Sequence, residues 1–160
     1  MTDFTEIPVL DLAPLIAGGD TSDLARQFAK AYGETGFGYV VNHGVDPDVR
    51  AAIFAATQRF HALSETQRQA IALNRRHRGY IAINTSTDVT SDLAEVTKPN
   101  QSASFMMMRE DARVDPDVYL SGPNQWPELA GFREACEAYT SAMTALGHKL
   151  MGLALDAIDA

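Results

Sequence analysis

The sequence is short of cysteine, of basic residues and of long apolar runs. Its 160 residues include one cysteine, Cys136, which excludes an internal disulfide and a metal site built from cysteines alone. Lysine and arginine number 13 against 21 aspartates and glutamates, and the resulting net charge of −8 argues against nucleic acid or an anionic membrane as partner. No apolar run has membrane-spanning length, and residues 1–6 show no signal-peptide pattern, so we expect a cytoplasmic protein.

Familiar catalytic and metal-binding patterns are also missing. The four histidines do not have the spacing of metal ligands, so a structural or solvated role is expected for His43, His61, His77 and His148. No serine or cysteine stands in a nucleophile motif. Glycines at 33, 36 and 38 imitate a phosphate loop, but they close a helix and open a strand, which is the reverse order. We therefore predict no catalytic residue and no metal ligand in this chain.

What the sequence does contain is material for one folded domain, with 46% apolar residues. Residues 37–41 form the most apolar and β-branched short run, bounded by Gly36 and Asn42, and they predict a buried strand. Further strands are predicted at 7–12, 79–83 and 104–108, and helices at 20–35, 46–63, 64–73 and 127–158. The first strand, helix and strand predict a parallel crossover, and the whole reads as α/β (α+β).

Two segments suggest binding, and each also has an ordinary structural interpretation. Arg75, Arg76 and Arg78 could hold an anionic group, but a cation-rich helix end explains them better. The run 104–108 could line an apolar pocket or simply pack in a core. Alternation along that strand places residues 104, 106 and 108 on one face and 105 and 107 on the other. The polar stretch 84–103 between these segments is predicted to be a long loop.

The last predicted helix has an apolar side that needs a surface to cover it. It carries one continuous apolar stripe, formed by Leu129, Phe132, Cys136, Tyr139, Met143, Leu146, Leu150 and Leu153. Either this stripe packs on the first helices, or it meets a surface that is absent from the chain. We expect it to be exposed, and we therefore expect marginal stability and self-association through the last helix.

Several motifs, in order along the chain, resemble one enzyme family. The segments 7–12 and 36–45, the latter reading Gly-Phe-Gly-Tyr-Val-Val-Asn-His-Gly-Val, resemble the N-terminal region of the isopenicillin N synthase-like iron(II)/2-oxoglutarate-dependent dioxygenases. Further similar elements follow at 60–64, 78–80, 104–105 and 122–127, with Phe132-Arg133 after them. The resemblance covers essentially the whole chain.

The resemblance implies that the chain is one part of a larger enzyme. Residues 1–126 would be the N-terminal domain, and 127–160 a long helix leading to a catalytic jelly roll that this chain does not contain. That jelly roll carries the His-x-Asp and distal His that hold iron, and an Arg-x-Ser for 2-oxoglutarate. No residue here matches them, so Fe(II) and 2-oxoglutarate are expected as cofactor and cosubstrate of the full enzyme and neither is expected to bind this chain alone.

The resemblance also points to candidate residues and to a function. Tyr80, Ser104 and Met106 are the positions expected to face a small-molecule substrate, with Arg78 as a carboxylate contact, while His43 is a structural turn residue. The full enzyme would hydroxylate, desaturate or cyclise its substrate, and its own catalytic half would be the partner of this chain. Relatives that use no 2-oxoglutarate stay open. So do two rivals, namely a non-catalytic module that binds a partner through the last helix and an unrelated α/β binding domain.

Overall fold

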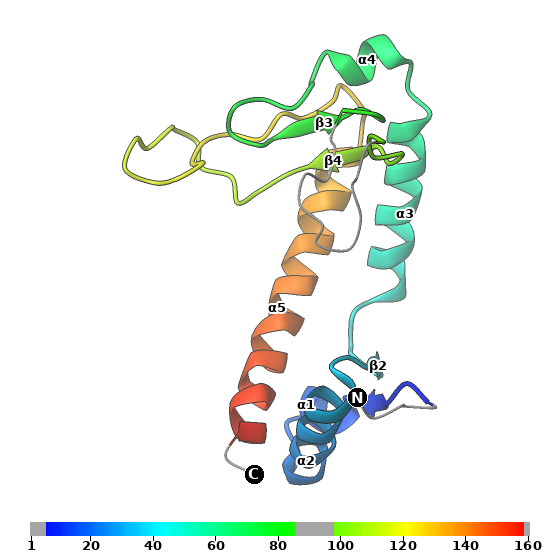
Figure 1. Cartoon of the computed structure of the whole chain (residues 1–160), viewed down its shortest axis with the longest axis vertical. Coiled ribbons are helices and arrows are strands. Elements are labelled where there is room, and N and C mark those ends of the chain that lie inside the picture. Colours follow the sequence, from blue (N-terminus) through cyan, green and yellow to red (C-terminus); the bar gives the residue numbers. More distant parts are fainter. Residues whose placement is uncertain (1–5, 86–97, 159–160) are drawn as a thin grey trace. The chain divides into compact units, whose positions relative to one another are not determined.

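The computed structural model describes residues 6–85 and 98–158, and it contains helices and short strands in mixed order (Figure 1). Two compact units are present, one formed by 1–53 with 134–160 and the other by 54–133. The predicted mixed class is confirmed. Most of the predicted loop 84–103, and residues 1–5 and 159–160, lie outside the described residues. Within the described ranges, no helix is long and apolar enough to cross a membrane.

The predicted parallel crossover opens the first unit. Strand β1 (Val9–Asp11) pairs in parallel with β2 (Tyr39–Val41), and Leu10 lies opposite Val40. Between them come α1 (Ala13–Ala17), α2 (Ser22–Lys30) and a single π-helical turn, η1 (Ala31–Thr35). Gly36 ends this helical run with φ +88°, a left-handed conformation that glycine adopts without a steric penalty. The two strands and the helix are therefore where the sequence predicts them.

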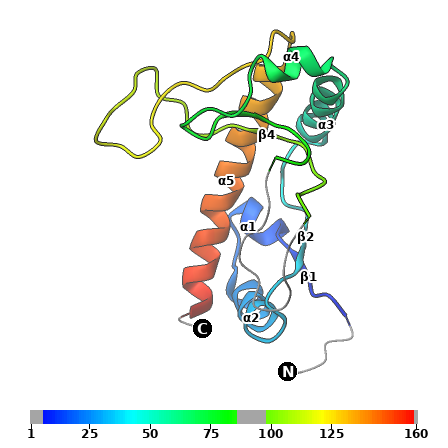
Figure 2. The ribbon, with the colours of Figure 1, turned by 45° about the horizontal axis from the view of Figure 1, so that its top comes forward.

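The core of this unit joins the crossover to the last helix. Its buried residues come from β1 and the residue after it, from α2 and η1, from the segment after β2 and from α5 (Phe132–Ile158), and they are Leu10, Leu12, Leu24, Ala25, Ala31, Val45, Leu146 and Leu153. In Figures 1 and 2, α1 and α2 lie between the red end of α5 and the strand pair. The last helix thus belongs to the same core as the first strand.

Strand β2 is not buried on both faces, contrary to the prediction. Val40 packs against the core, but Tyr39 is 61% exposed and Val41 is 39% exposed. The reason is that the sheet has two strands in the described part of the chain, with helices on one face. Val9, opposite Tyr39, is 57% exposed on the same outer side.

The second unit begins within the helix α3 (Pro47–His61) and continues into α4 (Glu65–Gln69). The predicted capping box at the start of α4 is confirmed, because the Ser64 hydroxyl accepts from the Gln67 N–H and the Gln67 side chain accepts from the Ser64 N–H. Helix α4 ends well before the predicted residue 73. The chain there turns to meet β3 (Gly79–Ile81), where Tyr80 N–H donates to the Ile71 carbonyl at 2.7 Å.

Strand β3 pairs in antiparallel register with β4 (Ser104–Met106), so both strands predicted in this region are present. Tyr80 lies opposite Phe105, and Ile81 lies opposite Ser104. The sequence predicts the two strands but not their pairing, because the segment between them is long and polar.

Helix α5 begins at Phe132, five residues later than predicted. Gly131 adopts φ +74°, and short turn hydrogen bonds from Leu129 to the Pro127 carbonyl and from Phe132 to the Leu129 carbonyl occupy the segment before it. The predicted apolar stripe is not exposed as expected. Its buried members are Phe132, Cys136, Leu146 and Leu153, and Met143 is the exposed one. The α5 outer stripe, defined as Met143, Met151, Leu155 and Ile158, faces solvent instead.

A pair of leucines on α5 tests which side of the helix packs inward. Leu153 is 1% exposed and Leu155 is 63% exposed. Leu153→Ala should lower the free energy of unfolding by about 2–5 kcal/mol because it leaves a cavity in the core. Leu155→Ala should change it by less than about 0.5 kcal/mol. Urea denaturation of both variants measures the difference, and equal losses would contradict the assignment of the two faces.

The ends of β1 and β2 are tied by a carboxylate. Asp11 Oδ1 accepts from the Ala13 N–H and from the Asn42 side-chain amide, both at 2.9 Å. These hydrogen bonds lower the pKa of Asp11 from its ordinary value of 3.8. The stabilisation is therefore present above pH 3.8 and is lost as the pH falls through the lower pKa of the folded state.

Asp11→Asn should be less stable than the wild type above pH 3.8, and the gap should close as the solution is acidified below that value. Urea midpoints of both proteins across this pH range provide the measurement. A gap that stays constant with pH would mean that the Asp11 charge contributes nothing to the tie.

Candidate functional site

The second unit is built around an aromatic cluster. The Phe60 ring stacks on Phe132 with 5.1 Å between centroids, and it meets Phe105 edge-on at 5.3 Å. Tyr80 and Trp126 complete the cluster through edge-to-face and tilted contacts. Phe60 is fully buried. These rings fix the inner face of the β3–β4 hairpin, because residues opposite one another in an antiparallel pair share a face.

The hairpin separates the residues that were predicted to face substrate. Tyr80 lies opposite Phe105 on the inner face and is 4% exposed. Ser104 and Met106 lie on the outer face, where Met106 is 40% exposed. The predicted alternation along this strand is confirmed, since Ser104, Met106 and Met108 are exposed and Phe105 and Met107 are half-buried. The hairpin therefore does not bring Tyr80 together with Ser104 and Met106.

Arg78 lies inside this unit. Its side chain is 1% exposed, and the protein itself supplies acceptors for its three guanidinium nitrogens. Nε donates to Asn124 Oδ1 at 3.1 Å, and Nη2 donates to the Arg109 carbonyl at 3.0 Å. Nη1 donates to the carbonyls of Arg76 and Leu120. The guanidinium thus holds together three segments that are distant in sequence, and we call this arrangement the Arg78 clamp.

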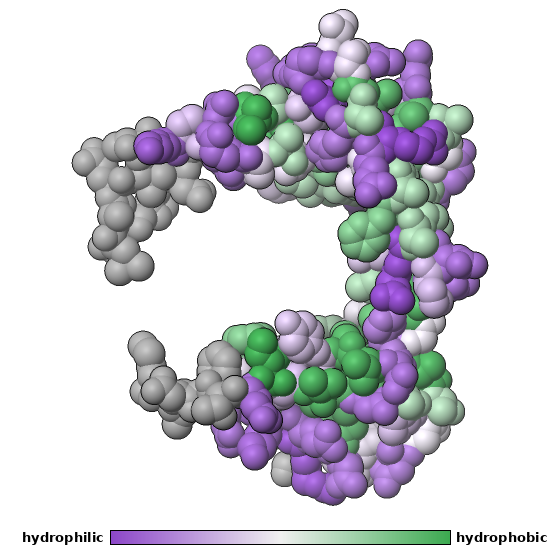
Figure 3. Space-filling model, turned by 90° about the vertical axis from the view of Figure 1, so that its right-hand side faces the viewer, coloured by the Kyte–Doolittle hydropathy of each residue, from purple (hydrophilic) through white to green (hydrophobic). Residues whose placement is uncertain are grey.

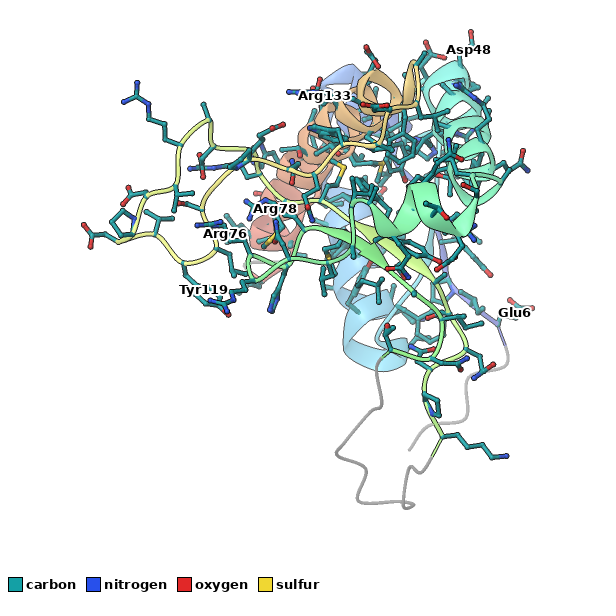
Figure 4. All side chains as sticks on the ribbon, turned by 90° about the horizontal axis from the view of Figure 1, so that it is seen from above. Glu6, Asp48, Arg76, Arg78, Tyr119 and Arg133 are labelled. Carbon is teal, nitrogen blue, oxygen red and sulfur yellow. The ribbon has the colours of Figure 1, made fainter. Side chains whose placement is uncertain are left out.

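The arginines around residue 75 do not form a helix end, contrary to the preferred interpretation. Helix α4 ends at Gln69, and residues 74–78 form a turn in which Asn74 Oδ1 accepts from the N–H groups of Arg76 and Arg78. Arg75 and Arg76 are exposed. Figure 4 shows Arg76 and Arg78 near each other beside the loop that carries Tyr119. The turn is set by Asn74, and the helix dipole plays no part in it.

Asn124 and Gln125 complete the clamp from the other side. The Asn124 side chain pairs with the backbone of Met108 in both directions, accepting from its N–H at 3.0 Å and donating to its carbonyl at 2.8 Å. Gln125 Nε2 donates to the carbonyls of Ala72 and Arg78. A Cβ at position 79 would collide with this amide and with the Ile71 carbonyl, so Gly79 is required there. The motifs 78–80 and 122–127 are therefore joined by hydrogen bonds into one structural unit.

A carboxylate anchors the same segment to the start of α5. Glu110 Oε2 accepts from Trp126 Nε1 at 3.2 Å and from Arg133 Nη2 at 3.1 Å, while its other oxygen accepts from the Asn124 N–H. Sequence reasoning missed Glu110, Asn124 and Gln125 as organising residues. The motif 122–127 was visible in the sequence, but its contacts reach residues 72–110 and cannot be read from local pattern.

The predicted site residues therefore have different environments. Arg78 and Tyr80 are enclosed by the protein, whereas Ser104 and Met106 face outward from β4. Contact of any of the four with substrate stays a prediction. Arg78 has hydrogen-bond acceptors within the protein for all three guanidinium nitrogens, so its buried guanidinium does not require an external carboxylate.

The histidines and the cysteine have structural surroundings. His43 Nδ1 accepts from the Val45 N–H at 3.1 Å, which closes the turn after β2 as the resemblance implied. Cys136 is 5% exposed, and burial, with a smaller contribution from Glu137, raises the pKa of its thiol. Across residues 6–85 and 98–158, no three His, Cys, Asp or Glu side chains gather in a way that could hold a metal ion. The His, Cys, Asp and Glu side chains in these described ranges do not fit an iron site.

The Arg78 clamp can be tested by a conservative change. Arg78→Lys keeps the charge but leaves several buried acceptors without a donor, and it should lower the free energy of unfolding by about 3 kcal/mol. Arg75→Lys, at an exposed position of the same turn, should change it by less than about 0.5 kcal/mol. The fluorescence of the single tryptophan, Trp126, reports unfolding of this unit in urea. A tolerated Arg78→Lys would show that the clamp is dispensable.

Comparison with known proteins agrees with the motif order. The family model described as non-haem dioxygenase in morphine synthesis, N-terminal, matches residues 7–129. Homoarginine-6-hydroxylase 2-ODD-C23.1 of Arabidopsis thaliana is 29% identical over 94% of this chain and 48% of its own length. Homoarginine-6-hydroxylase 2-ODD-C23 of Glycine max is 30% identical over 96% of this chain and 49% of its own. The chain spans about half the length of these curated relatives.

The fold is also found in solved structures. A full-length Neurospora crassa protein, crystallised in complex with alpha-KG and called the Neurospora protein below, superposes with a TM-score of 0.76 and 24% identity, over 96% of this chain and 47% of its own. At that identity the likeness establishes the fold. The family model covers most of the sequence, including the β1–β2 pair and the whole Arg78 clamp. The chain therefore belongs to the non-haem dioxygenase N-terminal family, the N-terminal region of the iron(II)/2-oxoglutarate-dependent dioxygenases.

Proposed function

We propose that this chain is the N-terminal part of an iron(II)/2-oxoglutarate-dependent oxygenase and supplies no catalytic group of its own. The full enzyme would use dioxygen to hydroxylate, desaturate or cyclise a small molecule, while 2-oxoglutarate is oxidatively decarboxylated to succinate and CO2. The observation that carries the proposal is the family match over residues 7–129 in a chain half as long as its relatives. The catalytic half would be its partner and would hold both Fe(II) and 2-oxoglutarate.

The proposal gives the described residues a supporting role. The aromatic cluster and the Arg78 clamp fix the β3–β4 hairpin, whose outer face carries Ser104 and Met106. A rigid hairpin with an exposed serine and methionine suits a wall of a substrate pocket, because its backbone is held by contacts on the other face. Tyr80 and Arg78 would then affect substrate binding indirectly, because they hold the hairpin in place. A cytoplasmic location is part of the same proposal.

A chimera tests the proposal. The part of the Neurospora protein that matches this chain is replaced by the chain, and the remainder of the Neurospora protein is kept. With iron(II) and dioxygen present, the chimera should convert 2-oxoglutarate to succinate and CO2, whereas the 160-residue chain alone should not. Succinate release is measured with and without iron(II).

The controls separate the proposal from its rival. The Neurospora protein without its matched part should lose turnover, which would show that the N-terminal part is needed. Turnover by the 160-residue chain alone would contradict the proposal, because a site would then exist within it. A folded chimera without turnover would favour the rival of a non-catalytic module.

A further inference from the structure

The positive charges of the chain are concentrated in its second unit. Residues 54–133 hold nine of the 13 lysines and arginines and nine of the 21 aspartates and glutamates, so the net charge of −8 is carried by the rest of the chain. On the face drawn in Figure 3, purple residues prevail over this unit, whereas green residues gather over the N-terminal unit. The second unit is therefore the part of the chain that repels an anionic ligand least.

Three of these arginines lie in one tight turn, residues 74–78, which we call the basic turn. Its ends are paired, because the Asn74 N–H donates to the Arg78 carbonyl at 2.9 Å. The Asn74 side chain closes the middle of the turn by accepting from the Arg76 N–H at 2.8 Å. These hydrogen bonds fix the backbone that carries Arg75 and Arg76, so a ligand would not have to order it.

The side chain of Arg76 is also held in place. A Cβ atom at Gly122, where φ is +136°, would lie 3.2 Å from Arg76 Cδ and 3.4 Å from Val114 Cγ2, so the stem of this arginine lies against the Gly122 backbone. Figure 4 shows Arg76 beside the loop that carries Tyr119. Among residues 6–85 and 98–158, the hydrogen bonds of Arg76 are made by its backbone, and the ion pairs involve other arginines. Its guanidinium is thus positioned without an acceptor in these ranges.

The buried neighbour Arg78 adds a charge that no carboxylate neutralises within the described residues. Its acceptors are the Asn124 amide oxygen and the carbonyls of residues 76, 109 and 120, and all of them are neutral. A guanidinium keeps its charge in proteins, and a buried charge is screened less than an exposed one. Because Arg78 Nη1 donates to the Arg76 carbonyl at 3.1 Å, this charge lies within the basic turn. An anion at Arg76 would therefore be attracted by both arginines.

Two acidic side chains that follow Arg109 in the adjoining loop are engaged elsewhere. Glu110 accepts from Trp126 Nε1 and from Arg133 Nη2, and Asp111 accepts from Arg109 Nη2 at 3.1 Å. Each of these carboxylates thus has an arginine partner outside the basic turn. They leave the charge of the basic turn uncompensated.

We propose that the basic turn is an anion site in which the guanidinium of Arg76 binds a carboxylate or phosphate group of a small-molecule ligand. The planar guanidinium fork matches the oxygens of either group. A small molecule fits better than a nucleic acid, because the rest of the chain carries the net charge of −8 and repels a polyanion. The site does not depend on the proposed function, since all the groups that form it belong to the described residues.

Titration of the 160-residue chain with inorganic phosphate tests the site. The ionic strength is kept constant, so that screening does not change, and the backbone amide resonances of residues 74–78 are followed by heteronuclear NMR. In the wild type these resonances should shift to saturation. Arg76→Gln should weaken phosphate binding by about tenfold or more, and Arg76→Lys should also weaken it, because an ammonium lacks the planar fork.

Acetate, titrated in the same way, separates the two kinds of group. Tighter binding of phosphate than of acetate supports a site for a phosphate group, and the reverse order supports a site for a carboxylate. In both cases Arg76→Gln should weaken the tighter ligand, because both use the same guanidinium.

Arg50→Gln is the matched control, since Arg50 is an exposed arginine of α3 and its loss changes the net charge equally. It should change phosphate binding by less than about twofold, because exposed charges at a distance are screened. Each variant should keep the urea midpoint of the wild type, read from the fluorescence of Trp126, because the substituted side chains are exposed.

Three results would overturn the proposal. They are a shift that does not saturate, equal weakening by Arg50→Gln and Arg76→Gln, and undiminished binding by a folded Arg76→Gln variant. The outcomes are independent of the proposed function. A chimera without succinate release leaves the anion site standing, and a chain that does not bind phosphate or acetate overturns the site and leaves the function standing.

Discussion

Packing of the last helix against the first strand is the interaction on which the N-terminal unit depends. Leu146 and Leu153 of α5 join Leu10 and Leu12 in one buried cluster, with Leu24 of α2 beside them. This cluster covers the inner face of a sheet that has only two strands in the described residues. Without α5, the cluster would lose Leu146 and Leu153, and the apolar side chains that these leucines cover would be open to water.

The second unit depends on a different kind of constraint. Its aromatic cluster supplies apolar burial, but the positions of the loops around it are set by polar side chains, of which Arg78 is buried and Asn124 and Gln125 are half-buried. Arg78, Asn124 and Gln125 bind backbone atoms in the segments 72–78 and 108–120. Such a network is specific because each buried donor and acceptor is costly to leave unpaired. The network therefore holds in a fixed position the hairpin that carries Ser104 and Met106.

The local parts of this structure were predictable from sequence, and the long-range parts were not. Gly36 as a helix end, the capping box of Ser64 and the alternation along β4 depend on neighbouring residues, and all three are confirmed. The period of the α5 stripe was also correct. Its burial was not predicted, because Leu146 and Leu153 are covered by residues from the start of the sequence and Phe132 by the aromatic cluster. The burial of Arg78 was likewise not predictable from its neighbours in the sequence. Its charge suggested a ligand, while its acceptors in the segments 109–124 are visible only in the fold.

The chain holds a specific scaffold and an apolar surface, but its described residues hold no cluster that could bind a metal ion. We propose that the chemistry belongs to a half of the protein beyond these residues. The most direct measurement is the intact mass of the protein from its natural source, set beside an iron(II) titration of the 160-residue chain. We expect a mass well above 17.4 kDa and no tight iron binding by the chain. A mass of 17.4 kDa with tight iron binding would contradict it.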